Sequence, residues 1–193
     1  MSLSRDEILA VFRETGALLE GHFILTSGLH SGTYFQCAQI FQYPEYSEKL
    51  CRDIVRHFQD VEIDLVVSPA VGGIIFGYEL ARQLGVRNIF TEREEGKMLL
   101  RRGFKVNPGD KVLVAEDVTT TGGSVRELMD SIEAGGGDIL AVTSIVDRSG
   151  GEARFGVPYY SLFQMDVKNY KPDDCPLCRQ GSQAVKPGSR KLK

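Results

Sequence analysis

Three short, largely apolar runs separated by helical patterns constrain the fold of this chain most strongly. They occupy residues 63–67, 112–115 and 139–146, and none alternates between apolar and polar residues as a strand with one wet face would. Between them, helical patterns end at Gly85 and at three consecutive glycines, 135–137. Buried strands that alternate with helices are typical of a parallel sheet covered on both faces, so we predict an α/β fold.

The rest of the chain lies on either side of this core. Ser4 and Glu7 fit a capping box, and apolar residues at helical spacing follow as far as Leu19. Short strands are expected at 23–25 and 33–37, on the two sides of turn residues. We divide the chain into an N-terminal subdomain (1–60), the α/β core (61–170) and a surface tail rich in Pro, Gly and Lys (171–193).

Charge and hydropathy exclude several classes of partner. The 193 residues include 23 Lys and Arg against 26 Asp and Glu, a formal charge of −3, whereas general nucleic-acid binding relies on a net basic surface. The apolar uncharged stretch 65–78 falls short of the ~20 apolar residues of a membrane span. The N-terminus has no signal-peptide pattern, and four cysteines are too few for a disulfide scaffold of this size. We therefore expect a cytoplasmic protein without membrane or nucleic-acid partners.

The segment 112–124 carries the strongest chemical signal. Four apolar residues indicate a buried strand, and Glu116 and Asp117 follow at its carboxyl end. Three threonines and two glycines then precede a helix. Glycines allow the backbone to approach a phosphate, the helix N-terminus offers free N–H groups, and two carboxylates suit a vicinal diol or a metal bound to it. The pattern therefore favours a sugar phosphate, although an acidic strand end before a flexible turn is the simpler alternative.

The whole string 112–124 resembles the phosphoribosyl-diphosphate (PRPP) signature of the type I phosphoribosyltransferases. The resemblance implies the type I phosphoribosyltransferase fold, a central parallel sheet flanked by helices with a small N-terminal hood. It implies that Glu116 and Asp117 hold the ribose hydroxyls, that residues 119–123 wrap the 5′-phosphate, and that Mg²⁺ binds through PRPP without a direct protein ligand. The PRPP-binding residues in this segment are then Glu116, Asp117, Val118, Thr119, Thr120, Thr121, Gly122, Gly123 and Ser124.

Residues 22–36 resemble the hood of the orotate phosphoribosyltransferases, where an aromatic pair lies against the pyrimidine. The resemblance gives Tyr34 and Phe35 this role, although we expect one of the two rings to belong to the core. Arg148 matches a family Asp-Arg and is implied to pair with the orotate carboxylate, which guanidinium binds bidentately. Its alternative role is that of a surface arginine. Thr26 and Thr120 complete the expected orotate contacts.

Residues 93–105 form a basic stretch, with five basic and two acidic side chains. By composition alone this is a solvated loop. In the family, the equivalent loop closes over PRPP, often in the partner subunit's site, which implies a homodimer that shares the 93–105 loop across its interface. Cations there would stabilise the leaving pyrophosphate, and closure would exclude water. The catalytic residues expected on this basis are Arg93, Lys97, Glu116 and Asp117.

A second glycine-containing loop, 68–73, follows the first core strand and matches the family's pyrophosphate loop. Val71 and Gly72 join the expected PRPP contacts, with Arg93 and Lys97, and we expect a strained or cis peptide bond at or next to Val71. Many family members have lysines at the positions of Thr26 and Gly72, and Lys and His around the positions of Glu94 and Leu99, and this chain has none of these. We expect the basic residues of 93–105 to compensate.

The tail contains Cys175 and Cys178, and with 186–190 it resembles a bacterial and archaeal subgroup of the orotate family. Structural zinc requires four ligands, and His22, His30 and His57 show no metal-ligand spacing. We therefore interpret the cysteine pair as thiols in a turn. The alternatives are a metal shared across a dimer and a redox-sensitive pair.

Together these features predict a magnesium-dependent orotate phosphoribosyltransferase of pyrimidine biosynthesis. Its substrates are PRPP and orotate, and its products are orotidine 5′-monophosphate and pyrophosphate. Two alternatives remain open: a phosphoribosyltransferase for a purine base, and a non-enzymatic PRPP-sensing regulator with the same fold. Arg148 separates the first of these from the favoured function, because a purine has no carboxylate for it to bind.

Overall fold

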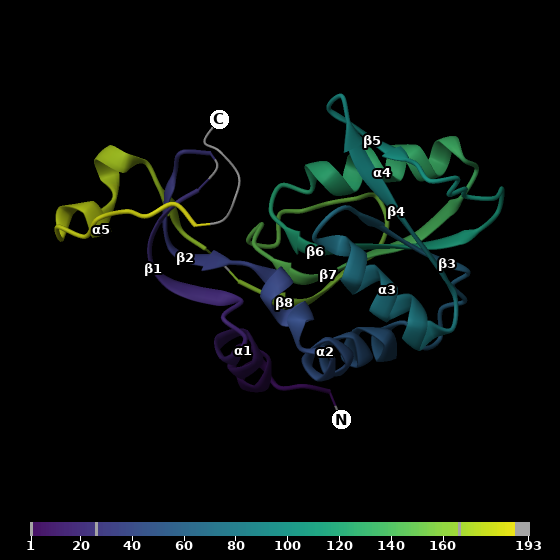
Figure 1. Ribbon diagram of the computed structural model, residues 1–193, viewed down its shortest axis with the longest axis horizontal. Coiled ribbons are helices and arrows are strands. Elements are labelled where there is room, and N and C mark those ends of the chain that lie inside the picture. The colour runs from purple at the N-terminus through teal and green to yellow at the C-terminus, as the bar shows by residue number, and fades with distance from the viewer. Residues whose placement is uncertain (1, 26, 166, 188–193) are drawn as a thin grey trace.

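The computed structural model describes residues 2–25, 27–165 and 167–187 and contains a six-stranded sheet in the order β5-β4-β3-β6-β7-β8. All neighbouring strands are parallel except β4 and β5, which form an antiparallel hairpin. The predicted α/β fold, with a mostly parallel sheet, is confirmed (Figure 1). The strands are β3 (Leu65–Pro69), β4 (Arg87–Glu94), β5 (Lys97–Leu100), β6 (Lys111–Thr119), β7 (Asp138–Asp147) and β8 (Tyr159–Gln164).

Helices cover both faces of this sheet, which explains why the strand sequences lack alternation. Leu65 and Val67 of β3 belong to the buried cluster formed with helix α4 (Gly123–Ala134). Val66, between them, belongs to the cluster that contains helices α2 (Pro44–His57) and α3 (Gly73–Leu84). Successive side chains of a strand point to opposite faces, so both faces of β3 are buried.

The N-terminal part begins with helix α1 (Arg5–Glu14), which has the predicted capping box between Ser4 and Glu7. The helix is shorter than expected, because Gly16 has a φ of 70° and turns the chain. Leu18 and Leu19, which continued the helical spacing, instead start strand β1 (Leu18–Ile24). Strand β2 (His30–Phe35) pairs with it antiparallel, and the short helix η1 (Cys37–Gln42) and the 14-residue helix α2 follow.

The tail folds back onto this hairpin. Strand β9 (Asn169–Tyr170) pairs with β2, and helices η2 (Pro172–Asp174) and α5 (Pro176–Arg179) follow. Val185 then bonds the other side of the hairpin, donating to the carbonyl of His22 at 2.9 Å and accepting from the N–H of Ile24 at 2.8 Å. Figure 1 shows this segment beside β1 and β2, at the end of the molecule away from the large sheet. The returning chain thus adds β9 as the third strand of the small sheet. The sequence did not reveal this arrangement, because the elements involved are short.

The basic stretch also differs from expectation. Instead of an irregular loop, it contains β5, which extends β4 as a hairpin around Glu95 and Gly96, both with positive φ. The alternation of buried Met98 with exposed Lys97 and Leu99 is that of an edge strand. No helix in the described parts of the chain is both long and apolar enough to cross a membrane.

Candidate active site

Two carboxylates stand at the carboxyl end of β6, where ligands bind in parallel α/β sheets. The side chain of Glu116 is 9% exposed, and one of its oxygens accepts the backbone N–H of Asp117 at 3.2 Å. Asp117 is half-buried. Because they are consecutive strand residues, the two side chains leave β6 on opposite faces. Glu116 lines the hollow formed by the loop that follows β6, and Asp117 contacts the loop that follows β3.

The loop that follows β6 encloses a small hollow of about 60 Å³, lined by Glu116 and residues 118–125. Gly122 has a φ of 74° and would bring a Cβ to within 2.7 Å of the Phe155 ring, so only glycine fits there. Arg126 of α4 donates to the Thr121 carbonyl at 2.8 Å and so stabilises the loop. Because Gly122 is the N-cap of α4, no N-cap side chain occupies the N–H groups of its first turn, which remain suited to an anion.

The loop after β3 lies directly against this site. The peptide bond between Ala70 and Val71 is cis, which confirms the expectation for that position. Val71 is 82% exposed, although it is apolar. A Cβ at Gly72 would lie 2.6 Å from Oδ2 of Asp117. The two predicted loops, distant in sequence, therefore meet at Asp117.

Arg148 follows β7 and borders the same site. Its backbone N–H donates to the Thr119 carbonyl at 2.8 Å, which ties it to the end of β6. Its guanidinium is half-buried, and its Nε is buried without a hydrogen-bond partner among the described residues. Burial lowers the pKa of Arg148, while Tyr34 and Cys37 lie close enough to counteract part of this effect. A half-buried cation with an unused donor is suited to an anionic ligand.

Cys37 connects these groups electrostatically, a role that the sequence did not indicate. Burial raises the pKa of its thiol strongly, the negative charges of Asp117 and Glu116 raise it further, and the positive charge of Arg148 opposes them. Cys37 is 1% exposed, in η1 directly after β2. It therefore lies within charge-interaction range of both carboxylates and the guanidinium.

The two aromatic residues of β2 have different surroundings. Phe35 is 5% exposed, and its ring packs edge-on against Phe12, 5.5 Å between centroids. Tyr34 is half-buried, 6.0 Å from the Phe23 ring, and interacts electrostatically with Arg148. The expectation that one ring belongs to the core is confirmed, and that ring is Phe35. The predicted orotate contact Thr26 lies outside the described residues, while Thr120 is exposed in the loop after β6.

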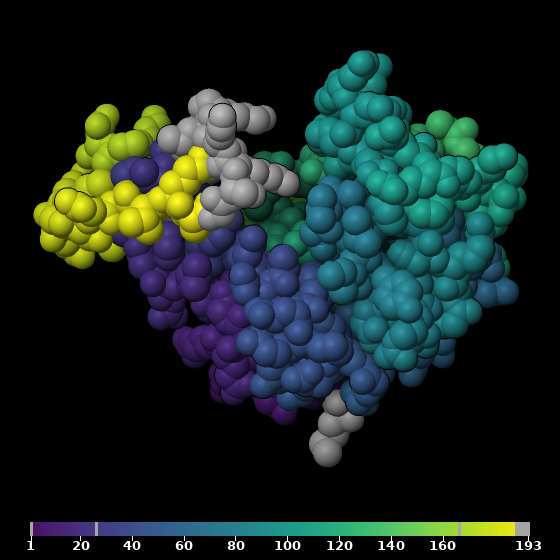
Figure 2. All heavy atoms as spheres, viewed as in Figure 1, coloured from purple at the N-terminus to yellow at the C-terminus, as the bar shows by residue number. Residues whose placement is uncertain are grey.

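The basic side chains of the β4–β5 hairpin are mostly paired with carboxylates. Arg93 contacts Glu127 of α4 at 2.8 Å and the Gly96 carbonyl, and Arg102 contacts Glu92 through two nitrogens. Lys97 is exposed beside the hairpin turn. Figure 2 shows the teal hairpin projecting on one side of a hollow with green atoms at its floor. The expected catalytic cations Arg93 and Lys97 thus stand on the hairpin, with Arg93 turned to α4.

A second cluster of chemically active side chains lies in the small sheet. His22, His30, Cys175 and Cys178 have ligand atoms that all lie within 4.8 Å of one another. The expectation that no histidine completes the cysteine pair is therefore wrong. The antiparallel pairing of β1 and β2 brings the histidines together, and the returning tail brings the cysteines to them.

The fold and this site are those of a phosphoribosyltransferase, and comparison with known proteins agrees. The profile of the family described as "Phosphoribosyl transferase domain" matches residues 38–176. The solved orotate phosphoribosyltransferase from Aeropyrum pernix superimposes with a TM-score of 0.70 over 82% of this chain and 93% of its own, at 24% identity, a likeness of fold.

Two curated relatives narrow the family assignment to one group of phosphoribosyltransferases. The orotate phosphoribosyltransferase of Desulforamulus reducens is 53% identical over 98% of this chain and all of its own length. That of Pelotomaculum thermopropionicum is 55% identical with the same coverage. The chain belongs to the phosphoribosyltransferase family, and within it to the orotate phosphoribosyltransferases.

Proposed function

We propose that this chain transfers the 5-phosphoribosyl group of PRPP to N1 of orotate, as its family membership implies. The new bond joins orotate N1 to C1 of the ribose, and the bond from C1 to the pyrophosphate oxygen breaks. Orotate N1 loses its proton, and pyrophosphate leaves with the bonding electrons. The products are orotidine 5′-monophosphate and pyrophosphate, a step of pyrimidine biosynthesis.

The observation that carries the orotate assignment is the environment of Arg148. A guanidinium that is half-buried, with an unused Nε, is stabilised when a carboxylate pairs with it. Orotate has such a carboxylate, and a purine base does not. Tyr34, close to Arg148, offers an aromatic side chain to the flat pyrimidine, whereas Phe35 serves the core. Thr26 and Thr120 remain proposed orotate contacts.

PRPP would occupy the hollow at the end of β6. Glu116 and Asp117 accept hydrogen bonds from the ribose hydroxyls, and residues 118–124 surround the 5′-phosphate with N–H and hydroxyl donors. The pyrophosphate lies toward Val71 and Gly72, where the loop touches Asp117. Holding two anionic substrates in line lowers the barrier by orientation and by electrostatic stabilisation, without a covalent intermediate.

The β4–β5 hairpin supplies the mobile cations of this proposal. Arg93 and Lys97 would turn from α4 and solvent to the leaving pyrophosphate as the hairpin closes. Closure would also exclude water from the reacting ribose. In a homodimer, residues 93–105 of one protomer would cover the site of its partner. We keep the dimer, and a cytoplasmic location, as proposals.

Magnesium fits this site as an ion bound by PRPP. The carboxylates of Glu116 and Asp117 would accept hydrogen bonds from the ribose hydroxyls, whose oxygens suit a hard cation. When bound, Mg²⁺ neutralises charge on the pyrophosphate. Glu116 and Asp117 hold the diol whose oxygens bind the ion, so the protein positions it through the substrate.

Substitution of Arg148 tests the function. We expect Arg148→Ala to lower kcat/KM for orotate by roughly 10²–10³-fold, because a partly desolvated charge pair is lost. The KM for PRPP should stay within about 3-fold, and Arg148→Lys should recover only part of the activity, because lysine cannot bind bidentately. Loss of orotate absorbance gives the rate. Turnover of adenine or xanthine by the unmodified protein, without turnover of orotate, would instead establish the purine alternative.

A further inference from the structure

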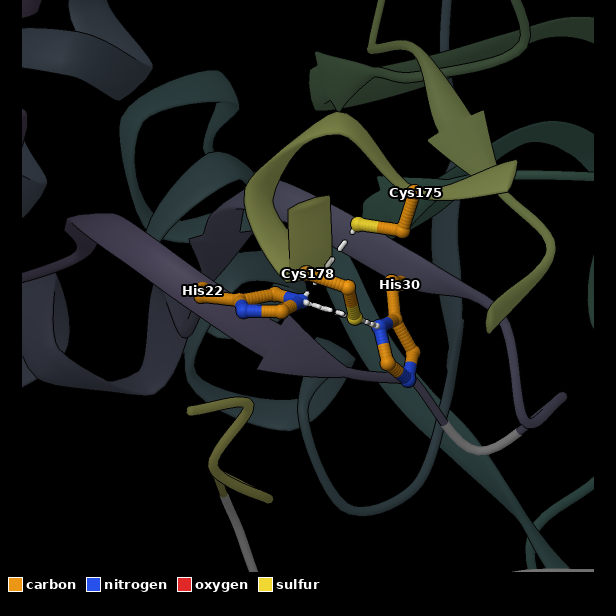
Figure 3. A group of neighbouring side chains, drawn as sticks. All are labelled: His22, His30, Cys175 and Cys178. Carbon is orange, nitrogen blue, oxygen red and sulfur yellow. Dashed lines mark hydrogen bonds between the residues drawn. The ribbon is translucent and has the colours of Figure 1, made fainter. Parts of the chain in front are cut away.

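Four potential metal ligands converge in the small sheet, far along the chain from one another. His22 is on β1 and His30 is on β2. Cys175 is the N-cap residue of α5, and Cys178 lies within that helix. Figure 3 shows the two imidazoles and the two thiols directed toward one common point, the histidines from the hairpin and the cysteines from the returning tail. None of these residues takes part in the proposed transfer reaction.

Three of the distances between these ligand atoms match a metal coordination sphere, and the His22–His30 distance is shorter. His22 Nε2 lies 2.9 Å from His30 Nδ1 and 3.5 Å from Cys175 Sγ. Cys178 Sγ lies 3.7 Å from His22 Nε2 and 3.3 Å from His30 Nδ1. Zinc bonds of about 2.3 Å to sulfur and 2.0–2.1 Å to nitrogen place tetrahedral ligand atoms roughly 3.3–3.8 Å apart. The cluster therefore needs only small side-chain adjustments to surround such an ion.

A hydrogen bond orients one imidazole for metal binding. His22 Nδ1 lies 3.0 Å from the Ser182 carbonyl oxygen, which can only accept, so Nδ1 carries the proton. Its Nε2 then presents a lone pair to the centre of the cluster. This arrangement, in which the second ring nitrogen donates to a backbone carbonyl, is usual for zinc-bound histidine.

The burial of these side chains also favours a metal site. His22 is 5% exposed, His30 is 8% exposed and Cys175 is fully buried, while Cys178 closes the cluster from the surface. Cys175 is the one residue of the described tail, 167–187, that belongs to the buried apolar core. The tail therefore has almost no hydrophobic core of its own, and small segments of this kind commonly depend on a metal or a disulfide.

We propose that His22, His30, Cys175 and Cys178 bind a structural zinc ion that fastens the C-terminal tail to the β1–β2 hairpin. Two thiolates and two imidazoles in a tetrahedral arrangement favour zinc among the common divalent metals. Four protein ligands fill the coordination sphere, so the ion has a structural role and no position for substrate. On binding, both thiols lose their protons to solvent and the metal takes no part in redox chemistry.

The position of the ion explains what it stabilises. The tail passes from β9, at the β2 edge, to Val185, at the β1 edge, so it crosses the hairpin between these contacts. The ion would fix the middle of that crossing and the ends of β1 and β2 that flank the 25–29 turn. If the proposed function is right, that turn also borders the orotate site through Thr26, so loss of zinc should also weaken orotate binding.

Metal content tests the proposal directly. The untagged chain, expressed with zinc and purified without chelators, should contain one zinc ion per chain by plasma mass spectrometry. Cys178→Ser should lose that zinc, and its side chain is exposed, so the fold should tolerate the change. Cys51→Ala is the matched control, because Cys51 is a free thiol in α2 away from the cluster and its zinc content should not change.

Cobalt reports the geometry independently of activity. Co²⁺ added to the metal-free protein should give the intense visible bands of a four-coordinate site and a thiolate charge-transfer band, both absent in Cys178→Ser. Chelation should lower the Tm of the unmodified protein and leave that of Cys178→Ser unchanged.

Three results would overturn the proposal. They are zinc content far below one per chain in the zinc-supplied protein, absence of the cobalt bands, and a Cys175–Cys178 disulfide in protein isolated without oxygen. None of these measurements depends on orotate turnover, so failure of the zinc site and failure of the proposed function are distinguishable.

Discussion

Gly72 and Asp117 are in such close contact that a Cβ on Gly72 would lie 2.6 Å from the Asp117 carboxylate oxygen. Gly72 has a φ of −61° and a ψ of −40°, which alanine adopts readily. The glycine is therefore required for space and not for backbone freedom. Its absent side chain allows the loop after β3 and the carboxylate after β6 to share one site.

Gly72→Ala should consequently impair the site and spare the fold. The added methyl group must displace Asp117 or the loop, so we expect kcat/KM for PRPP to fall by about 10²-fold, as for a misplacement of about 1 Å. The Tm should change by only a few degrees. Gly32→Ala is the control, because its new Cβ would meet nothing nearer than Leu177, at 3.9 Å. Unchanged PRPP kinetics in Gly72→Ala would show that the contact is irrelevant to binding.

Tyr34 and Phe35 should respond to substitution in opposite ways. Phe35 packs against Phe12, so Phe35→Ala should lower the free energy of unfolding by about 3–5 kcal/mol. Tyr34→Ala should cost much less stability and raise the KM for orotate, because its ring is half-buried near Arg148. Denaturant unfolding and orotate kinetics on both variants make the comparison. A larger stability loss in Tyr34→Ala than in Phe35→Ala would contradict these assignments.

The sequence predicted the site where its residues are contiguous and missed what the tertiary fold assembles. Glu116, Asp117 and the loop after them are one string, so their common location required only a strand and a helix start. His22 and Cys175 are 153 positions apart, and the strand β9 that brings the tail to the hairpin has two residues. Such a short strand has no readable periodicity.

A single glycine accounts for the wrong extent of the first helix. The apolar spacing continued to Leu19, but Gly16, with its positive φ, ends the helix before the pattern does. Hydrophobic spacing records which residues are buried, and Leu18 is indeed 6% exposed. It does not record whether a helix or a strand buries them.

Glu79 should make stability depend on pH in the acid range. Hydrogen bonds from Arg82 lower its pKa below the ordinary value of 4.5, and Gln83 adds to this against the opposing effect of burial. A carboxyl with a lowered folded-state pKa stabilises the protein above the unfolded pKa, and this contribution is lost as pH falls through the folded value. Glu79→Gln should therefore cost about 1 kcal/mol at pH 7, and this cost should shrink as the pH falls below the ordinary pKa of 4.5.

Unfolding by urea across this pH range measures the difference. Glu20→Gln is the control, because the Arg13–Glu20 pair is exposed and spans 3.4 Å, so its loss should cost less than about 0.5 kcal/mol at any pH. A Glu79→Gln penalty that stays constant from neutral to acid pH would exclude the ionised carboxylate as its cause.

Substitutions of Arg93 and of Glu127 distinguish a structural role of Arg93 from a catalytic one. Their ion pair, 2.8 Å long, joins the hairpin to α4 with both side chains more than 40% exposed. Such a pair contributes only about 0–1 kcal/mol, so Glu127→Gln should change kcat by less than about 5-fold. Arg93→Ala should lower kcat by about 10²-fold or more if Arg93 stabilises the leaving pyrophosphate. Equal effects of the two substitutions on steady-state kcat would mean that Arg93 only holds the hairpin, leaving Lys97 as the candidate cation.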